Sequence, residues 1–215
     1  MNKIILLIFL CLGTTSFGQQ LYIEGGKTMS SFDYKNSQGG RLDNLQATPH
    51  SFMAIGYRKQ IFIKNLNVLL GTSYAGYGAI GSDDNLGNYM EWNLNYLEFN
   101  VGLDYELFKI KEVKFYLKGT VSAEFLLQGV QTLNNRIIDL KNNDDFDKTL
   151  FDFRGGFGFS HPISQNFSFY VQYMHGKSLA LKEGTAVTSD QEELRIVSNN
   201  VSFGLLINIA KKITN

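Results

Sequence analysis

The strongest constraint in this sequence is a regular alternation of apolar and polar residues over long segments. From Val113 to Gln128 the odd positions carry Val, Phe, Leu, Gly or Ala, whereas most even positions carry Lys, Thr, Ser, Glu or Gln. A period of two residues is that of a β-strand whose two faces meet different environments. The segment therefore predicts one long, two-faced strand.

The same alternation recurs along the chain and predicts eight strands. The expected strands cover residues 20–32, 51–63, 66–77, 96–107, 113–128, 151–160, 167–176 and 201–209. The first of them loses its alternation after Gly25 and Gly26. A β-bulge at this pair would explain the change of parity.

The connections between these strands alternate between long and short. Long polar connections are expected at residues 35–49, 80–93, 132–148 and 182–193, and tight turns at 64–67, 109–112 and 161–166. In an up-and-down antiparallel barrel, such an alternation places every long loop at one end. We therefore predict an all-β fold, an eight-stranded antiparallel up-and-down barrel.

The N-terminus has the pattern of a secretory signal peptide. Lys3 is followed by an apolar stretch over residues 4–12, and the small residues Ser16 and Gly18 suit a cleavage site. We expect a signal peptide over residues 1–18 and one mature domain over 19–215. Beyond residue 18 no apolar run approaches the roughly 20 residues of a spanning helix. Lys plus Arg equal Asp plus Glu at 20 each, which argues against nucleic acid as a partner.

The polar face of the predicted strands decides which face meets lipid. It is rich in Gly, Ser, Thr and Asn with isolated charges of both signs, which suits a crowded interior better than a face in water. An eight-stranded barrel is only wide enough for side chains, so these charges must pair and close the lumen. The predicted lumen network consists of Glu24, Arg58, Glu98, Asp104, Lys118, Glu124, Asp152 and Arg154. Aromatic residues near the strand ends predict a girdle at the membrane surfaces, formed by Tyr57, Tyr74, Trp92, Tyr105 and Tyr173.

The last predicted strand carries a further pattern. Ser202, Gly204, Ile207 and Ile209 are similar to the assembly signal polar-x-Gly-x-x-apolar-x-aromatic, with Ile209 at the aromatic position. In this and in its strand pattern, the chain resembles the small eight-stranded, porin-like family of the outer membrane protein β-barrel domain. The resemblance implies a Gram-negative outer-membrane location, insertion by the barrel assembly machinery, and contact with lipopolysaccharide and phospholipid. It also implies short periplasmic turns and long extracellular loops.

Residues that could carry chemistry do not form a convincing site. Carboxylates cluster in the expected loops, at Asp83, Asp84, Asp144, Asp145, Asp147, Glu192 and Glu193, without the spacing of an EF-hand. Barrel lipid A deacylases use a His and a Ser two residues apart, whereas His175 and Ser178 are three apart and fall on opposite strand faces. We therefore expect no metal, no cofactor and no catalytic residues.

The sequence thus favours a non-enzymatic barrel with a plugged lumen, a structural or surface-interaction role and unidentified loop ligands. Three alternatives remain open: a narrow porin-like channel, a lipid-modifying enzyme related to the deacylases, and a soluble periplasmic barrel that binds an apolar ligand.

Overall fold

The computed structural model describes residues 18–35, 40, 44–61, 63–83, 87–143, 148–183 and 192–209. Except for Gly18, the predicted signal peptide lies outside this part of the chain. The strands are β1 (Gln19–Lys35), β2 (Gln46–Gln60), β3 (Leu66–Asp83), β4 (Asn88–Ile110), β5 (Val113–Leu133), β6 (Arg136–Asp139), β7 (Thr149–Pro162), β8 (Phe167–Ser178), β9 (Leu181–Glu183) and β10 (Glu192–Asn208). Among the described residues, no helix has the length and apolar character required to cross a membrane.

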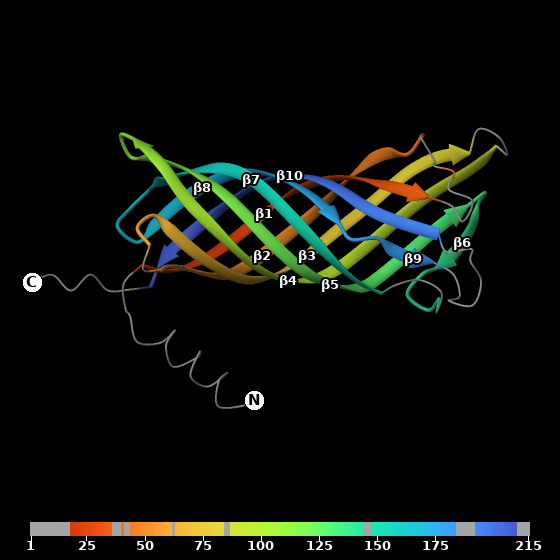
Figure 1. Cartoon of the computed structure of the whole chain (residues 1–215), viewed down its shortest axis with the longest axis horizontal. Helices are drawn as coiled ribbons and strands as arrows, with labels where there is room; N and C mark the ends of the chain where they lie inside the picture. Colours follow the sequence, from red (N-terminus) through yellow and green to blue (C-terminus); the bar gives the residue numbers. More distant parts are fainter. Residues whose placement is uncertain are drawn as a thin grey trace, which may run out of the picture.

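Eight of these strands close into a barrel (Figure 1). The order around the ring is β1, β2, β3, β4, β5, β7, β8 and β10, and β10 pairs again with β1. Every pairing is antiparallel, and the short strands β6 and β9 extend β5 and β10 at one end. The predicted eight-stranded antiparallel barrel is confirmed. We call the end with the tight turns the turn end and the opposite end the loop end.

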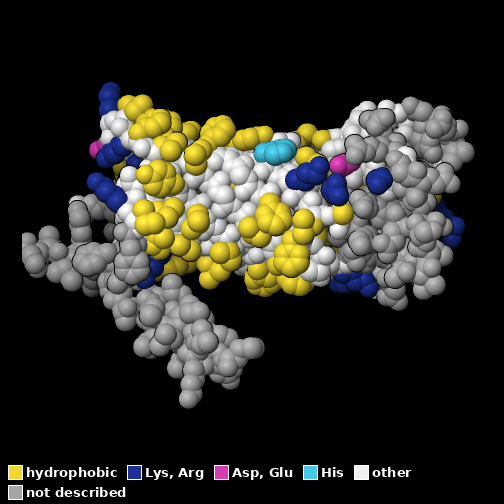
Figure 2. Space-filling model, in the orientation of Figure 1, with side chains coloured by type: hydrophobic (Ala, Val, Ile, Leu, Met, Phe, Trp, Pro, Cys, Tyr) yellow, Lys and Arg dark blue, Asp and Glu magenta, His cyan; other side chains and the backbone are white. Residues whose placement is uncertain are grey.

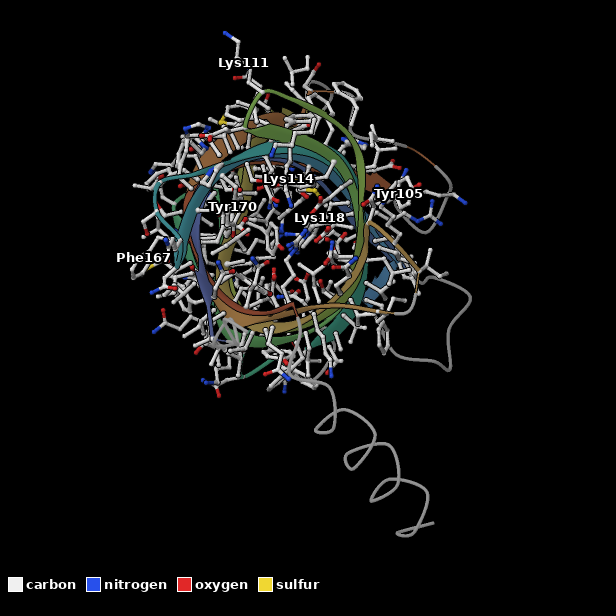
Figure 3. The ribbon with its side chains drawn as sticks, turned by 90° about the vertical axis from the view of Figure 1, so that its left-hand side faces the viewer. Tyr105, Lys111, Lys114, Lys118, Phe167 and Tyr170 are labelled. Carbon is white, nitrogen blue, oxygen red and sulfur yellow. The ribbon has the colours of Figure 1, made fainter. Side chains whose placement is uncertain are left out.

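The two faces of the wall have opposite chemistry. On β7, for example, Phe151, Phe153 and Phe157 point outward and are 49, 48 and 59% exposed, whereas Asp152 and Ser160 point inward and are buried. Figure 2 shows hydrophobic side chains covering much of the visible outer face of the barrel. Figure 3, a view from the turn end, shows Lys114, Lys118 and Tyr170 inside the ring. An apolar outside and a polar inside are what a strand needs when it crosses lipid.

The bulge expected at Gly25 and Gly26 is wrong. Strand β1 pairs without a break with β10 from Gln20 to Lys35 and with β2 from Gln19 to Ser30. A β-carbon on Gly26 would lie 2.9 Å from the Phe52 ring and collide with the backbone of β10, so glycine is needed there for space.

The alternation seemed to end in β1 because the inward residues change character along the strand. Glu24, Thr28 and Ser30 point inward and are polar, and the next inward residue is the apolar Phe32. The parity of the strand is therefore intact.

The strands run further toward the loop end than the alternation predicted. Most of the expected loop at 80–93 is a continuous pairing of β3 with β4, which extends to Asp83 and Asn88. The expected loop at 132–148 contains the hairpin of β5 with β6, whose turn residues Asn134 and Asn135 both have positive φ. Positive φ at both central residues is typical of a type I′ turn, whose twist matches that of the two strands of a hairpin.

This extension is stabilised by an apolar core inside the barrel. The buried cluster at the loop end contains Phe32, Phe52, Ala75, Tyr77, Ala79, Trp92, Leu94, Tyr96, Leu126, Leu140, Leu150, Leu194 and Ile196. Trp92 points inward and packs edge-on against Phe32, with ring centroids 5.6 Å apart. The expected place of Trp92 in an outer girdle is therefore wrong, whereas Tyr74, Tyr105 and Tyr173 are exposed on the outer face.

Candidate functional site

The largest group of buried charges lies around Arg154 of β7. Its Nη1 and Nη2 donate to the two carboxylate oxygens of Glu98 on β4, at 3.0 and 2.7 Å. Nη2 also donates to Glu124 of β5 at 2.6 Å, and Nε lies 2.5 Å from the carboxylate of Asp152. The hydroxyl of Tyr77 donates to Glu98 at 2.5 Å. One guanidinium therefore holds together three carboxylates from three strands.

A second ion pair lies nearer the turn end. Arg58 of β2 donates through Nε and Nη2 to the two carboxylate oxygens of Asp104 on β4, each at 2.7 Å. The amide of Asn67 donates to the same carboxylate at 2.8 Å. This bidentate geometry gives Arg–carboxylate pairs their strength and fixed orientation.

A third pair completes the set of eight predicted lumen residues. The ammonium of Lys118 lies 3.7 Å from the carboxylate of Glu24, and its side chain is only 9% exposed. Tyr170 and Gln172 of β8 donate to Glu24 at 2.8 and 2.7 Å. All eight side chains point into the barrel, and the strand register brings them together in three clusters.

The sequence reasoning missed the neutral members of these clusters. Tyr77, Tyr170 and Gln172 each bond a lumen carboxylate, yet they were not singled out as lumen residues. Their parity was the available signal, because each occupies an inward position of its strand, as the buried residues beside them do.

The clusters leave little open space in the middle of the barrel. One cavity of about 20 Å³ lies between Arg58, Lys118 and Tyr170, and one of about 50 Å³ lies between Glu24, Asn100 and Arg154. These volumes are of the size that holds one or a few water molecules. A wider bowl of about 340 Å³ opens at the turn end, beside Arg58, Glu106 and Lys114.

The predicted assembly-signal residues occupy both faces of the last strand. Ser202 and Gly204 of β10 point inward and are buried. A β-carbon on Gly204 would overlap the ring of Tyr170. Ile207 is half-buried on the outward parity, and Ile209, just after the strand, is 48% exposed.

His175 and Ser178 are separated by the wall of the barrel. His175 is exposed on the outer face, where its Nδ1 lies 3.0 Å from Oδ1 of Asn199. Ser178 is buried on the inner face, where its hydroxyl accepts from the amide of Ile196 and donates to the carbonyl of Leu179. The regular parity of β8 keeps the two side chains apart.

The acidic residues of the expected loops add no site within the described chain. Asp84, Asp144, Asp145 and Asp147 lie outside the described residues. Among the residues that are described, no three His, Cys, Asp or Glu side chains gather as metal ligands would.

Solved structures similar to this chain include small outer-membrane barrels. Neisserial surface protein A is 13% identical with a TM-score of 0.48, and the match covers 88% of this chain and 97% of that one. OprG from Pseudomonas aeruginosa is 12% identical with a TM-score of 0.49, over 89% and 97% of the two chains. Ail of Yersinia pestis, in complex with the heparin analogue sucrose octasulfate, is 13% identical with a TM-score of 0.37, over 86% and 99%.

The family comparison is more direct. No curated protein sequence matches the chain. A family model, described as the outer membrane protein beta-barrel domain, matches residues 19–176, which is most of the sequence and reaches from β1 into β8. With its closed ring and lipid-facing belt, the chain belongs to the outer membrane protein beta-barrel domain family and is located in the outer membrane.

Proposed function

We propose that this protein is a closed barrel that anchors a structured rim at the cell surface, in a structural or surface-interaction role. The observation that carries the proposal is what fills the inside of the barrel. Three ion-pair clusters fill its middle, and the apolar core around Trp92 fills its loop end.

The charged clusters support a closed barrel on energetic grounds. Arg58 and Arg154 each have about 10% of the side chain exposed, and both are held by carboxylates at 2.7 Å or less. Separating a buried pair leaves charges without a partner, at a cost of about 3–5 kcal/mol per pair. A solute that passes along the barrel axis would have to break several of these pairs.

The loop end supports a role at the rim. There the strands extend beyond the apolar belt. Leu94, Tyr96 and Leu140 lie in the core inside this part of the barrel and have no exposed surface. Such packing makes the ends of the strands a rigid platform for the connections they carry. Our proposal places this end outside the cell and the tight turns in the periplasm.

The proposal also includes partners. The barrel assembly machinery inserts the chain by way of β10, and lipopolysaccharide and phospholipid surround the belt.

The proposal assigns no enzymatic step, because His175 and Ser178 lie on opposite sides of the wall. A lipid A mass spectrum that is the same with wild type and with His175→Ala is the expected result, and a loss of acyl chains only with wild type would contradict it.

Conductance through a planar bilayer tests the closed lumen. The folded protein should produce no current steps above those of a protein-free bilayer, while a reconstituted porin in the same bilayer provides the positive control. Regular steps of constant size with the wild-type chain would show an open path and would replace our proposal with the porin-like alternative.

A further inference from the structure

A group of basic side chains lies on the outside of the barrel, at the edge of the apolar belt. Tyr173 on β8 and Val201 on β10 pair with each other, and the next outward residues toward the loop end are His175 and Asn199. Val201 also pairs with Lys27 on β1, and Lys27 pairs with Ser51 on β2. From this level toward the loop end, polar and charged side chains replace most of the apolar ones, although Met29 and Leu179 are still exposed there.

Three cations are concentrated just at or beyond this level. Lys27 donates to Ser51 at 2.9 Å, and the ammonium of Lys177 lies 3.3 Å from the carboxylate of Asp33 with 52% of its side chain exposed. Arg195 pairs with Asp33 in the register of β10 with β1. We call Lys27, Lys177 and Arg195 the basic patch. Asp33 is the one acidic residue among the outward side chains described on this face, so the patch carries an excess of two positive charges.

In Figure 2, Lys and Arg side chains gather near a His and an acidic side chain at the edge of the hydrophobic surface, toward the loop end. The other side of the ring is different. Residues 66–97, which include β3 and the first half of β4, contain no Lys or Arg. The basic patch is therefore local to β8, β10 and β1.

We propose that the basic patch binds the phosphate groups of an anionic lipid in the outer leaflet. A phosphate-bearing lipid suits this position because its acyl chains would lie on Phe203, Val201 and Tyr173 while its headgroup meets the cations. Lys side chains near a membrane surface extend toward headgroups in this way and attract anionic lipids. Asn199 adds a polar side chain next to Tyr173, and its Oδ1 accepts a hydrogen bond from the Tyr173 hydroxyl at 2.6 Å.

The spacing of the cations indicates a headgroup with more than one phosphate. Lys27 and Lys177 are two strands apart, and Lys177 lies four residues beyond Tyr173, the residue level with Lys27. With strands about 4.8 Å apart and a rise of about 3.4 Å per residue, their α-carbons are about 17 Å apart. Two phosphates at the ends of a broad headgroup match this separation better than one.

This inference rests on the proposed orientation, with the loop end outside, but not on the closed lumen. A conducting barrel would therefore leave it intact. Conversely, a failure of lipid binding would leave the conductance result unchanged, so the two outcomes can be told apart.

The test measures lipid binding by the folded protein in detergent, by native mass spectrometry during a titration with bisphosphorylated lipid A. The double variant Lys27→Ala/Lys177→Ala should bind about 30-fold more weakly, because each Lys near an anionic headgroup strengthens binding about fivefold. The matched control is Arg136→Ala/Lys141→Ala, which removes the same charge from exposed positions in β6 and just after it, on the other side of the ring. Its affinity should change less than twofold.

Three results would overturn the proposal. The first is equal binding by the wild type and the patch variant, with both shown to be folded by their gel migration before boiling. The second is equal binding of a phosphate-free lipid A analogue, which would assign the affinity to the apolar belt. The third is displacement of the lipid by millimolar inorganic phosphate, which would indicate a site for the free anion. Weaker binding of the monophosphorylated lipid would support the two-phosphate geometry, and equal binding would refute it.

Discussion

Replacing Arg154 by Met should strongly destabilise the barrel. The guanidinium is the common partner of Glu98, Glu124 and Asp152, at 2.7, 2.6 and 2.5 Å, and its side chain is 10% exposed. Met has a similar length but no charge, so the substitution leaves three carboxylates facing one another without a cation. Removing one partner of a buried ion pair costs about 3–5 kcal/mol. The unfolding equilibrium constant should therefore rise by roughly two to nearly four orders of magnitude.

The assay is urea unfolding of the protein in lipid vesicles, followed by tryptophan fluorescence. Trp92 is the single Trp of the chain and is buried against Phe32, so its emission reports on the folded loop end. Lys114→Met is the control, because Lys114 pairs with Glu106 at 3.0 Å with 43% of its side chain exposed. An exposed pair of this kind contributes about 0–1 kcal/mol.

A double variant separates charge from packing. Glu98→Gln in the Arg154→Met background removes one of the stranded carboxylates and should restore part of the lost stability, whereas Glu98→Gln alone should be destabilising. The reasoning is refuted if Arg154→Met changes the free energy of unfolding by less than about 1 kcal/mol. Equal effects of Glu98→Gln in both backgrounds would also refute it, because the two residues would then act independently.

The remaining predictions concern the core, the wall and the barrel as a whole. Leu94→Ala should lower the free energy of unfolding by about 2–5 kcal/mol, because Leu94 has no exposed surface in the loop-end core; a loss below 1 kcal/mol in the same assay would contradict this. Gly156→Ala should cost about 1–3 kcal/mol, because its β-carbon would overlap the carbonyl of Tyr173, whereas Gly155→Ala, with nothing within 4 Å, should be neutral; equal effects would argue against the close strand contact. Finally, the protein in the outer-membrane fraction should migrate differently on a detergent gel before and after boiling, and identical migration would contradict a stable barrel in the membrane.

The strand pattern and the faces of the strands could be predicted from the sequence because they are local properties. A residue's parity assigns its face once the strand is recognised, which is why Glu98, Lys118 and Arg154 were predicted as inward residues. The alternation of short and long connections likewise predicted which strand ends lie together. The eight-stranded ring needed no information beyond these patterns.

The partners of the inward residues depend on register, which the sequence pattern does not contain. Arg154 meets Glu98 and Glu124 across 56 and 30 residues of chain, and a slip of one residue in any pairing would separate them. Tyr77 and Tyr170 have the inward parity of their strands, but only those pairings show which carboxylate each hydroxyl meets.

The position of each residue along the barrel axis could be learned only from the tertiary structure. Trp92 and Leu94 have the inward parity of Glu98, yet they lie beyond the lipid belt and face a core that resembles the interior of a soluble protein. The sequence by itself determined which residues share a face. What surrounds the wall of the barrel changes along each strand, from lipid around the apolar belt to water around the loop end. Only the closed, tilted ring sets where each residue lies relative to that boundary.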